Sequence, residues 1–362
     1  MRKTKVLVVD DSAFMRKVLS EILSTDAGIE VVGTARNGQD AIAKVAEIKP
    51  DVVTMDIEMP KMDGIEALRF LMENNPLPIV MISSLTQQGA DATVQALELG
   101  AIDFISKPSG AISLDIHKVK EQIIEKVKSA AQANPKRIMA VLKRDQTKIN
   151  VLNQREPRGL LQTATTSAPH LIVIGVSTGG PNALKCLLEE LPEDFPAALF
   201  IVQHMPARFT KSLARRLNDV CELQVREAEQ GVVAQAGYAY IAPGDYHMEI
   251  RARHRGGWQI ELNQDDPVGS HRPSVDKLFE SVSKLNHPSK IAIILTGMGS
   301  DGTKGLELMK QSGCREAIAE AESSCVIFGM PRAAIHSGNI DRILPIHEIG
   351  PYLTKKLINR TE

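Results

Sequence analysis

The sequence predicts an α/β protein of two domains, each containing a doubly wound, mostly parallel sheet. The chain has 362 residues, which exceeds the size of one ordinary domain. Short apolar runs alternate with helical patterns on both sides of a polar, basic stretch. Such alternation is typical of parallel sheets covered by helices on both faces. We therefore expect a first domain at residues 1–125, a linker at 126–167 and a second domain at 168–355.

Five apolar runs predict a five-stranded parallel sheet in the first domain. Between the first two runs, Phe14, Val18 and Ile22 follow one another at intervals of four residues. This spacing places them on one face of a helix, as expected for a segment that packs on a sheet. The five predicted strands are Lys5–Val9, Val31–Ala35, Asp51–Met55, Pro78–Ile82 and Ala101–Ile105.

The second domain resumes the same alternation. Strand-like runs occur in "HLIVIGVSTGG", "AALFIVQHM" and "IAIILTGMGSDG", with helical signals between them. The stretch from 238 to 266 instead shows hairpin-like alternation and Gly-rich turns. The linker lacks sustained periodicity, although Ile138–Leu142 is apolar enough to pack on a neighbour.

Composition narrows the function classes. The net charge is -1, so no overall basic field indicates nucleic-acid binding, and no compact basic helix-turn-helix pattern supports a DNA-binding output domain. The N-terminus lacks the apolar stretch of a signal peptide, and no apolar run approaches the roughly 18–20 residues that cross a bilayer. We expect a cytoplasmic protein with reduced thiols and no zinc site, because no CxxC spacing occurs. The cysteines are Cys186, Cys221, Cys314 and Cys325.

Carboxylates, a lysine and a hydroxyl follow the predicted strands of the first domain. Asp10 and Asp11 end the first strand, Asp56 ends the third, Ser83 follows the fourth and Lys107 the fifth. The carboxyl ends of parallel strands meet at one edge of a sheet. Three carboxylates there favour a hard divalent cation such as Mg²⁺, which compensates their mutual repulsion. A carboxylate beside such a cation, with an ammonium and a hydroxyl nearby, can accept a phosphoryl group.

The stretches "VVDDS", "VVTMDIEMPKMDG" and "DFISKP" resemble the receiver domain of two-component response regulators. The resemblance implies a flavodoxin-like fold in which a histidine kinase phosphorylates Asp56 with Mg²⁺ as cofactor. It implies metal binding by Asp10, Asp11, Asp56 and the backbone carbonyl of Glu58, and switch roles for Ser83, Phe104 and Lys107.

Three chemically reactive side chains follow strands of the second domain. Ser177 lies in a G-x-S-x-G turn between a strand and a helix, His204 follows the next strand, and Asp301 follows the strand that ends at "IAIIL". Such a serine turn also occurs in phosphate-binding loops, but a dinucleotide site would have glycine at the place of Ser177. A serine that is activated by a base, which a carboxylate orients, favours acyl-transfer hydrolysis. The chain order differs from that of α/β-hydrolases, so that fold is not implied.

The glycines around Met298 allow backbone amides to approach an oxyanion, and the amide of Met298 is a candidate donor. Thr178 is an equally good candidate for a hydroxyl at the site or for a cap of the following helix.

The second domain resembles the catalytic domain of the chemotaxis-specific protein-glutamate methylesterases. The matching stretches are "GVSTGGP", "VQHMPARFTKSLARRL", "IAPGDYHM", "HRPSVDKLF", "TGMGSDG" and "GMPRAA". The resemblance implies Ser177 as nucleophile, His204 as general base and acid, and Asp301 as orienting carboxylate, with Thr178 and Met298 completing the site. It implies chemoreceptor methyl esters and glutamines as substrates, with no cofactor for the esterase. We expect a monomer without direct membrane insertion.

Several residues carry weaker signals. We interpret the basic helix pattern mainly as a solvated face, with an acidic receptor surface as the alternative. The residues of that pattern are Lys211, Arg215 and Arg216. His271 and Arg272 fit loop structure and a site lining equally well, whereas Trp258 and His247 favour packing. Because a phosphoacceptor is joined to a hydrolase, we expect the unphosphorylated first domain to block the catalytic crevice partly, and phosphorylation at Asp56 to weaken that interface.

Overall fold

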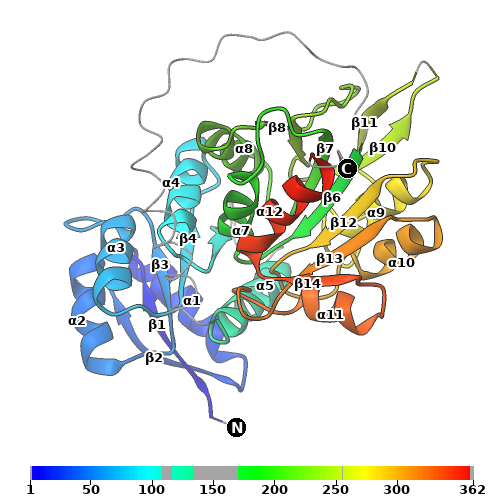
Figure 1. The fold of residues 1–362 in the computed structure, drawn as a ribbon. Helices are drawn as coiled ribbons and strands as arrows, with labels where there is room; N and C mark the ends of the chain where they lie inside the picture. The colour runs from blue at the N-terminus through cyan, green and yellow to red at the C-terminus, as the bar shows by residue number, and fades with distance from the viewer. Residues whose placement is uncertain (1, 108–115, 134–169, 255, 359–362) are drawn as a thin grey trace. The chain divides into compact units, whose positions relative to one another are not determined.

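The structure is a computed structural model that describes residues 2–107, 116–133, 170–254 and 256–358 (Figure 1). The chain divides into two compact units, Met1–Lys143 and Arg144–Glu362. Within the predicted linker, residues 126–130 belong to the last helix of the first unit. The stretch 134–167, which includes Ile138–Leu142, lies outside the described residues, so the domain limits remain predictions.

The first unit contains the predicted five-stranded parallel sheet, in the order β2-β1-β3-β4-β5. Strand order reverses between β1 and β3, the place where open α/β sheets bind ligands. The elements are β1 (Thr4–Val9), α1 (Ala13–Ser24), β2 (Ile29–Ala35), α2 (Gly38–Ile48), β3 (Val52–Asp56), α3 (Gly64–Asn74), β4 (Ile79–Ser83), α4 (Gln87–Glu98), β5 (Asp103–Ser106) and α5 (Ile116–Ala130).

Burial and capping explain these elements. Every residue of β3 and β4 is buried, as expected for central strands covered on both faces. Helices α1 and α5 contact each other, and α3 contacts both α2 and α4, so the two groups cover opposite faces of the sheet. Four of the helices begin at a residue whose side chain accepts a hydrogen bond from the first turn. These capping residues are Ser12, Asn37, Asp63 and Thr86.

The second unit contains a seven-stranded, wholly parallel sheet in the order β14-β13-β12-β6-β7-β9-β8. The predicted doubly wound architecture is therefore confirmed, with the reversal of strand order between β6 and β12. The elements of this sheet and its helices are β6 (His170–Val176), α7 (Gly180–Leu188), β7 (Ala197–Gln203), α8 (Phe209–Val220), β8 (Gln224–Glu227), β9 (Tyr238–Ile241), α9 (Val275–Ser283), β12 (Lys290–Ile294), α10 (Thr303–Gln311), β13 (Glu316–Glu320), α11 (Met330–His336), β14 (Arg342–Leu344) and α12 (Ile346–Leu357).

A two-stranded antiparallel ribbon interrupts this pattern between β9 and α9. It consists of β10 (His247–Ala252) and β11 (Trp258–Asn263), in the stretch where the sequence predicts a hairpin. Met248, Ile250 and Ile260 are buried and join the core that β6, β7 and α9 also line. The base of the ribbon is thus part of the domain core.

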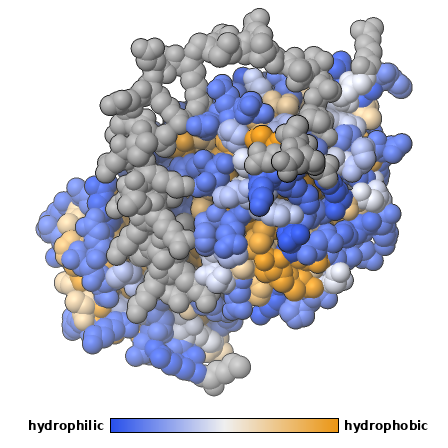
Figure 2. Space-filling model, viewed as in Figure 1, coloured by the Kyte–Doolittle hydropathy of each residue, from blue (hydrophilic) through white to orange (hydrophobic). Residues whose placement is uncertain are grey.

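Two helix layers cover the seven-stranded sheet. Helix α10 contacts α9 and α11, while α7 contacts α8 and α12. Hydrophilic side chains cover most of the face seen in Figure 2, with hydrophobic residues in smaller patches. In the described part of the chain, no helix combines the length and apolar character needed to span a bilayer.

Candidate functional site

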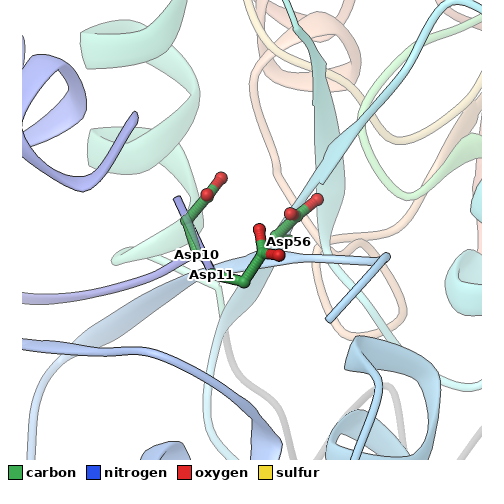
Figure 3. Close-up of side chains that lie close together, drawn as sticks. All are labelled: Asp10, Asp11 and Asp56. Atoms are coloured by element: carbon green, nitrogen blue, oxygen red, sulfur yellow. The ribbon is translucent and has the colours of Figure 1, made fainter. Parts of the chain in front are cut away.

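The first candidate site is a group of three carboxylates at the edge of the first sheet (Figure 3). Asp10 and Asp11 follow β1, and Asp56 ends the neighbouring β3. One carboxylate oxygen from each lies within 4.8 Å of the others. Asp10 and Asp56 are buried, whereas Asp11 is exposed. The structure therefore brings the three predicted aspartates together at the reversal of strand order.

Lys107 reaches this group from the end of β5. Its Nζ lies 2.7 Å from Asp56 Oδ2 and 3.5 Å from Asp10 Oδ2. Burial would lower the pKa of Lys107, but its hydrogen bond to Asp56 and the two carboxylate charges raise that pKa overall. Burial, with the nearby charges of Asp10 and Asp11, raises the pKa of Asp56 to about 6 despite the hydrogen bond from Lys107. One lysine thus compensates these carboxylates only partly.

The donor set fits a divalent cation. Asp10 Oδ1 accepts a hydrogen bond from the amide of Ser12, whereas Asp10 Oδ2 is buried with no hydrogen-bond partner among the described residues. A hard cation with oxygen ligands satisfies such an orphaned oxygen and offsets the burial that raises the pKa of Asp10. The role predicted for the Glu58 carbonyl stays a prediction.

A close backbone approach shapes the loop after Asp56. The amide of Gly64 donates to Ile57 O, and a Cβ at position 64 would lie 2.0 Å from Asp56 O. Only glycine fits there, because any side chain would collide with the backbone of the predicted phosphoacceptor. This close approach explains why the third residue of the motif "MDG" is glycine.

The predicted switch residues lie in separate contacts. The Ser83 hydroxyl donates to Gly89 O at 3.1 Å and accepts from Thr93 Oγ1 at 2.7 Å. Phe104 is buried in β5, with Lys126 Nζ 5.0 Å from its ring centroid. The switch roles of Ser83 and Phe104 remain predictions.

The second candidate site lies at the carboxyl ends of β6, β7 and β12. Val176 pairs with Gln203, so the next residues, Ser177 and His204, leave adjacent strands side by side. The amide of His204 donates to Val176 O, and the amide of Ser177 donates to Thr296 O just past β12. These hydrogen bonds place the half-buried Ser177 between the other two strand ends.

His204 is hydrogen-bonded to Asp301. His204 Nε2 and Asp301 Oδ2 are 2.8 Å apart, and both side chains are nearly buried. Because an ionised carboxylate only accepts, this bond puts the imidazole proton on Nε2 and leaves Nδ1 as the basic nitrogen. Nδ1 is buried and has no hydrogen-bond partner in the described structure, the Ser177 hydroxyl included. Catalytic hydrogen bonds are often long before substrate binds.

Asp301 is held as an anion by four donors. Besides His204 Nε2, its carboxylate accepts from Ser274 Oγ at 2.9 Å and from the amides of Val275 and Asp276 at 2.7 and 2.9 Å. These amides form the first turn of α9, where the helix dipole also favours negative charge. Burial alone would raise the pKa of Asp301, but the hydrogen bonds and His204 lower it to about 2.

Asp276 makes the reciprocal contact. Its Oδ1 accepts from the amides of Gly302 and Gly305, at the start of α10 directly after Asp301. Asp301 thus caps α9 while Asp276, in the first turn of α9, caps α10. This exchange fixes the loop that carries Asp301.

The turn after β12 is fixed by a buried acid. Glu320, at the end of β13, accepts from the amide of Thr296 at 2.8 Å and from Ser324 Oγ at 2.9 Å. Thr296 Oγ1 in turn donates to Thr178 O at 2.9 Å. Burial raises the pKa of Glu320 to about 7. Next to Thr296, Gly297 packs so closely that an added Cβ would lie 2.8 Å from Ser177 Cβ.

The predicted supporting residues have different surroundings. Helix α7 has Gly179 as its N-cap, and Thr178 lies directly before it. Met298 is half-buried in the turn beside Gly297, whose carbonyl accepts from the amides of Gly329 and Met330. The oxyanion roles of Thr178 and Met298 stay predictions.

Sequence reasoning left His271 and Arg272 open and interpreted Trp258 and His247 as packing residues. His271 stacks on His204 with ring centroids 4.0 Å apart, whereas Arg272 donates to Gln264 O and Asp265 O within its loop. Trp258 packs edge-on against His287, consistent with a packing role. His247 is fully buried, and its Nδ1 accepts a hydrogen bond from the amide of Ser274. The hydroxyl of the same serine donates to Asp301.

Some supporting residues escaped sequence reasoning. Gln203 is buried, and its Nε2 donates to Ser177 O at 2.9 Å. Other hydrogen bonds fix the two loops that face Ser177. Ser274 donates to Asp301, Asp276 accepts from the amide of Gly302, and Glu320 accepts from the amide of Thr296. In the sequence, the S-x-x-K pattern that begins at Ser274 indicates only the start of a helix. Gln203 and Glu320 are recognisable as polar residues at strand ends, but the sequence does not indicate which groups they bind.

Comparison with known proteins gives two family matches. Residues 172–353 match the family model described as CheB methylesterase, and residues 6–117 match the response regulator receiver domain. A protein-glutamate methylesterase/protein-glutamine glutaminase of Halalkalibacterium halodurans is 51% identical over 98% of both chains. The protein of that name from Geobacillus kaustophilus is 48% identical over 96% of this chain and 97% of its own. The crystal structure of the Thermotoga maritima CheB methylesterase catalytic domain is 43% identical, with a TM-score of 0.50, over 52% of this chain and 98% of that domain.

Proposed function

The chain belongs to the CheB methylesterase family, and from that premise we propose a phosphorylation-regulated hydrolase that removes methyl esters from glutamyl side chains of chemoreceptors. It also deamidates receptor glutamines, and the names of its relatives include protein-glutamine glutaminase. Together these reactions set the number of receptor carboxylates during chemotactic adaptation.

Acylation begins with Ser177. Its Oγ attacks the ester carbonyl carbon while His204 Nδ1 takes the hydroxyl proton, since Nε2 is committed to Asp301. The imidazolium that forms is stabilised by the Asp301 anion. The tetrahedral intermediate then collapses, the bond to the methoxy oxygen breaks, and His204 returns the proton so that methanol leaves.

Deacylation repeats these steps with water. His204 takes a proton from water, the resulting hydroxide attacks the acyl-enzyme, and the glutamate carboxylate leaves as Ser177 recovers its proton. With a glutamine substrate, ammonia leaves in place of methanol. Backbone amides of the turn at Met298, together with Thr178, stabilise the oxyanion in both steps.

Control comes from the first unit. Asp56 accepts the phosphoryl group from a chemotaxis histidine kinase. Asp10, Asp11 and Asp56 would hold Mg²⁺, and the backbone carbonyl of Glu58 would be a further ligand. When bound, Mg²⁺ would neutralise negative charge on the phosphoryl group. Lys107 already contacts Asp56 and stabilises the phosphoryl oxygens. Ser83 and Phe104 respond to the phosphate, and this change in the first unit raises the hydrolase activity of the second unit. We place this reaction in the cytoplasm and expect a monomer.

One observation carries the hydrolase proposal: the 2.8 Å bond between His204 and an Asp301 anion, beside the adjacent strand ends of Ser177 and His204. The test is methanol release from methylated chemoreceptor membranes, with and without acetyl phosphate and Mg²⁺. Release that rises with the phosphodonor supports hydrolysis and its control together. Methanol release that does not change with the phosphodonor would contradict regulation by phosphorylation. No release in either condition would contradict the assigned substrate.

A further inference from the structure

Gln203 is a buried glutamine at the last position of β7, directly before His204. It pairs with Val176, the last residue of the neighbouring strand β6, and Ser177 follows Val176 (Figure 1). The glutamine therefore lies at the two strand ends that carry the proposed nucleophile and base. Burial removes a polar side chain from water, so such a residue is expected to have hydrogen bonds that compensate.

One amide group links the backbones of these two residues. Gln203 Nε2 donates to Ser177 O at 2.9 Å and to His204 O at 3.4 Å. Carbonyl oxygens only accept, so the amide nitrogen of the glutamine must face both of them. Neither contact uses the Ser177 hydroxyl or the imidazole of His204, so both groups stay available for the reaction.

The backbone of Ser177 is already satisfied without this glutamine. Its carbonyl accepts from the amide of Gly180 at 2.8 Å, and its own amide donates to Thr296 O at 3.0 Å. The amide of Gln203 is thus a second donor to a carbonyl that has one. Hydrogen bonding at Ser177 therefore does not by itself explain a glutamine at this position.

The oxygen of the same amide is unfavourable for stability. Gln203 Oε1 is buried and has no hydrogen-bond partner among the residues that the structure describes. A Cβ at Gly180 would collide with this oxygen, so the start of α7 packs directly on the amide and holds it in place. A buried acceptor without a partner is destabilising, whereas an apolar side chain of similar shape leaves none. Departures of this kind are expected where a residue serves function.

We propose that Gln203 is a positioning residue, which holds the backbones of Ser177 and His204 at the separation that their proton transfer requires. This inference rests on the proposed function, because the separation matters only if Ser177 gives its proton to His204. Small displacements of reacting groups slow the chemical step. Gln203 is buried beneath the reacting groups and acts through two carbonyls, so it affects kcat and not KM.

The test uses Gln203→Met in the full-length chain. Methionine is unbranched and close to glutamine in length, so it fills the same space but donates no hydrogen bond and leaves no amide oxygen. Gln259→Met is the matched control, because Gln259 Nε2 in β11 also donates to a backbone carbonyl, Gly231 O, at 2.8 Å. Methanol release is measured with acetyl phosphate and Mg²⁺, on methylated chemoreceptor membranes and on the small ester N-acetyl-glutamate α-amide γ-methyl ester. Tm is measured on the same samples.

We expect Q203M to lower kcat about ten- to hundredfold on both substrates, with KM within about twofold of wild type. Its Tm is no lower than that of wild type, because the unpartnered oxygen is gone. Q259M keeps the wild-type kcat and KM on both substrates.

A fall in kcat of less than about tenfold in Q203M overturns the inference, and so does a change confined to KM. A Tm that falls together with kcat, or a variant that does not fold, also overturns it, because the glutamine would then serve the fold and not the reaction. A wild type that releases methanol from neither substrate overturns the proposed function itself.

Discussion

Asp56 and Asp301 occupy equivalent places in the two units, yet their acidities differ in opposite directions. Each follows a parallel strand next to the reversal of strand order, and each is nearly buried. The pKa of Asp56 is raised to about 6, because burial and the charges of its acidic neighbours outweigh the hydrogen bond from Lys107. The pKa of Asp301 is lowered to about 2, because its hydrogen bonds outweigh the effect of burial.

The number of donors decides the difference. Asp56 Oδ2 accepts one side-chain hydrogen bond, from Lys107, and shares its surroundings with two other carboxylates. Asp301 accepts four hydrogen bonds and lies at a helix N-terminus. A carboxylate that must react with a phosphodonor remains incompletely satisfied until a cation binds. A carboxylate that must stay an anion throughout a reaction is satisfied in advance.

The largest expected effect is a loss of methanol release at the second site with no change in phosphorylation at the first. Ser177→Ala removes the only nucleophile in the proposed mechanism, so methanol release falls by on the order of 10⁴–10⁶-fold. Phosphorylation of Asp56 by acetyl phosphate proceeds at the wild-type rate. Release is followed on methylated chemoreceptor membranes, and Ser283→Ala, a hydroxyl at the end of α9, is the control. Release by S177A at more than a few per cent of wild type identifies a different nucleophile.

The next effect tests whether Asp301 acts as a fixed anion. In Asp301→Asn the amide group takes the place of an acceptor, so it favours the wrong tautomer of His204 and stabilises no imidazolium. We expect kcat to fall by on the order of 10³–10⁴-fold with KM nearly unchanged. The measurement is kcat across pH, together with Tm to show that the variant is folded. A folded variant with near wild-type kcat would contradict the orienting role.

The reactive ends of both sheets could be predicted from the sequence, because that inference needs only strand order and the residue after each strand. Asp10, Asp56 and Lys107 met as expected, and so did His204 and Asp301. Ser177 lies beside them, but its hydroxyl has no hydrogen bond to His204 Nδ1 in the described residues. The sequence pattern alone indicates what chemistry each site supports. It does not give the distance between the Ser177 hydroxyl and His204 Nδ1.

The supporting residues could not be predicted, because their roles depend on contacts between distant segments. Asp276 caps a helix that begins 27 positions later at Thr303, and Glu320 bonds to Thr296 across two neighbouring strands. Hydrophobic periodicity indicates which face of a helix or strand is buried. It does not indicate which polar group of another segment contacts that face.

A smaller effect concerns the reactive carboxylate. Asp56→Asn removes the phosphoacceptor, and it also removes one of three charges that repel one another. We expect all stimulation by acetyl phosphate and Mg²⁺ to disappear, whereas thermal stability stays the same or rises because a buried, partly compensated charge is gone. The measurements are methanol release with and without the donor, and Tm. Stimulation that survives in the variant places the phosphate elsewhere.

Glu320 sharpens the comparison, since it is a third buried carboxyl at a strand end and has an intermediate number of donors. It accepts hydrogen bonds from Thr296 N, Ser324 Oγ and the side chain of Cys325, and burial raises its pKa to about 7 from an ordinary value of 4.5. A carboxyl whose pKa is raised by folding holds its proton more tightly in the native state. Its stabilising effect is therefore complete below pH 4.5 and is lost as the pH rises through about 7.

Glu320→Gln keeps the shape of the neutral acid and removes the titration. We expect the variant and wild type to have similar urea midpoints at pH 5, and the variant to be more stable at pH 8 by on the order of 3 kcal/mol. Glu320→Ala instead loses stability at both pH values, because it leaves a cavity and an unpaired amide at Thr296. Equal pH dependence in wild type and E320Q would mean that three hydrogen bonds suffice to keep Glu320 ionised. The number of donors that keeps a buried carboxylate ionised would then be three or fewer, instead of the four that Asp301 has.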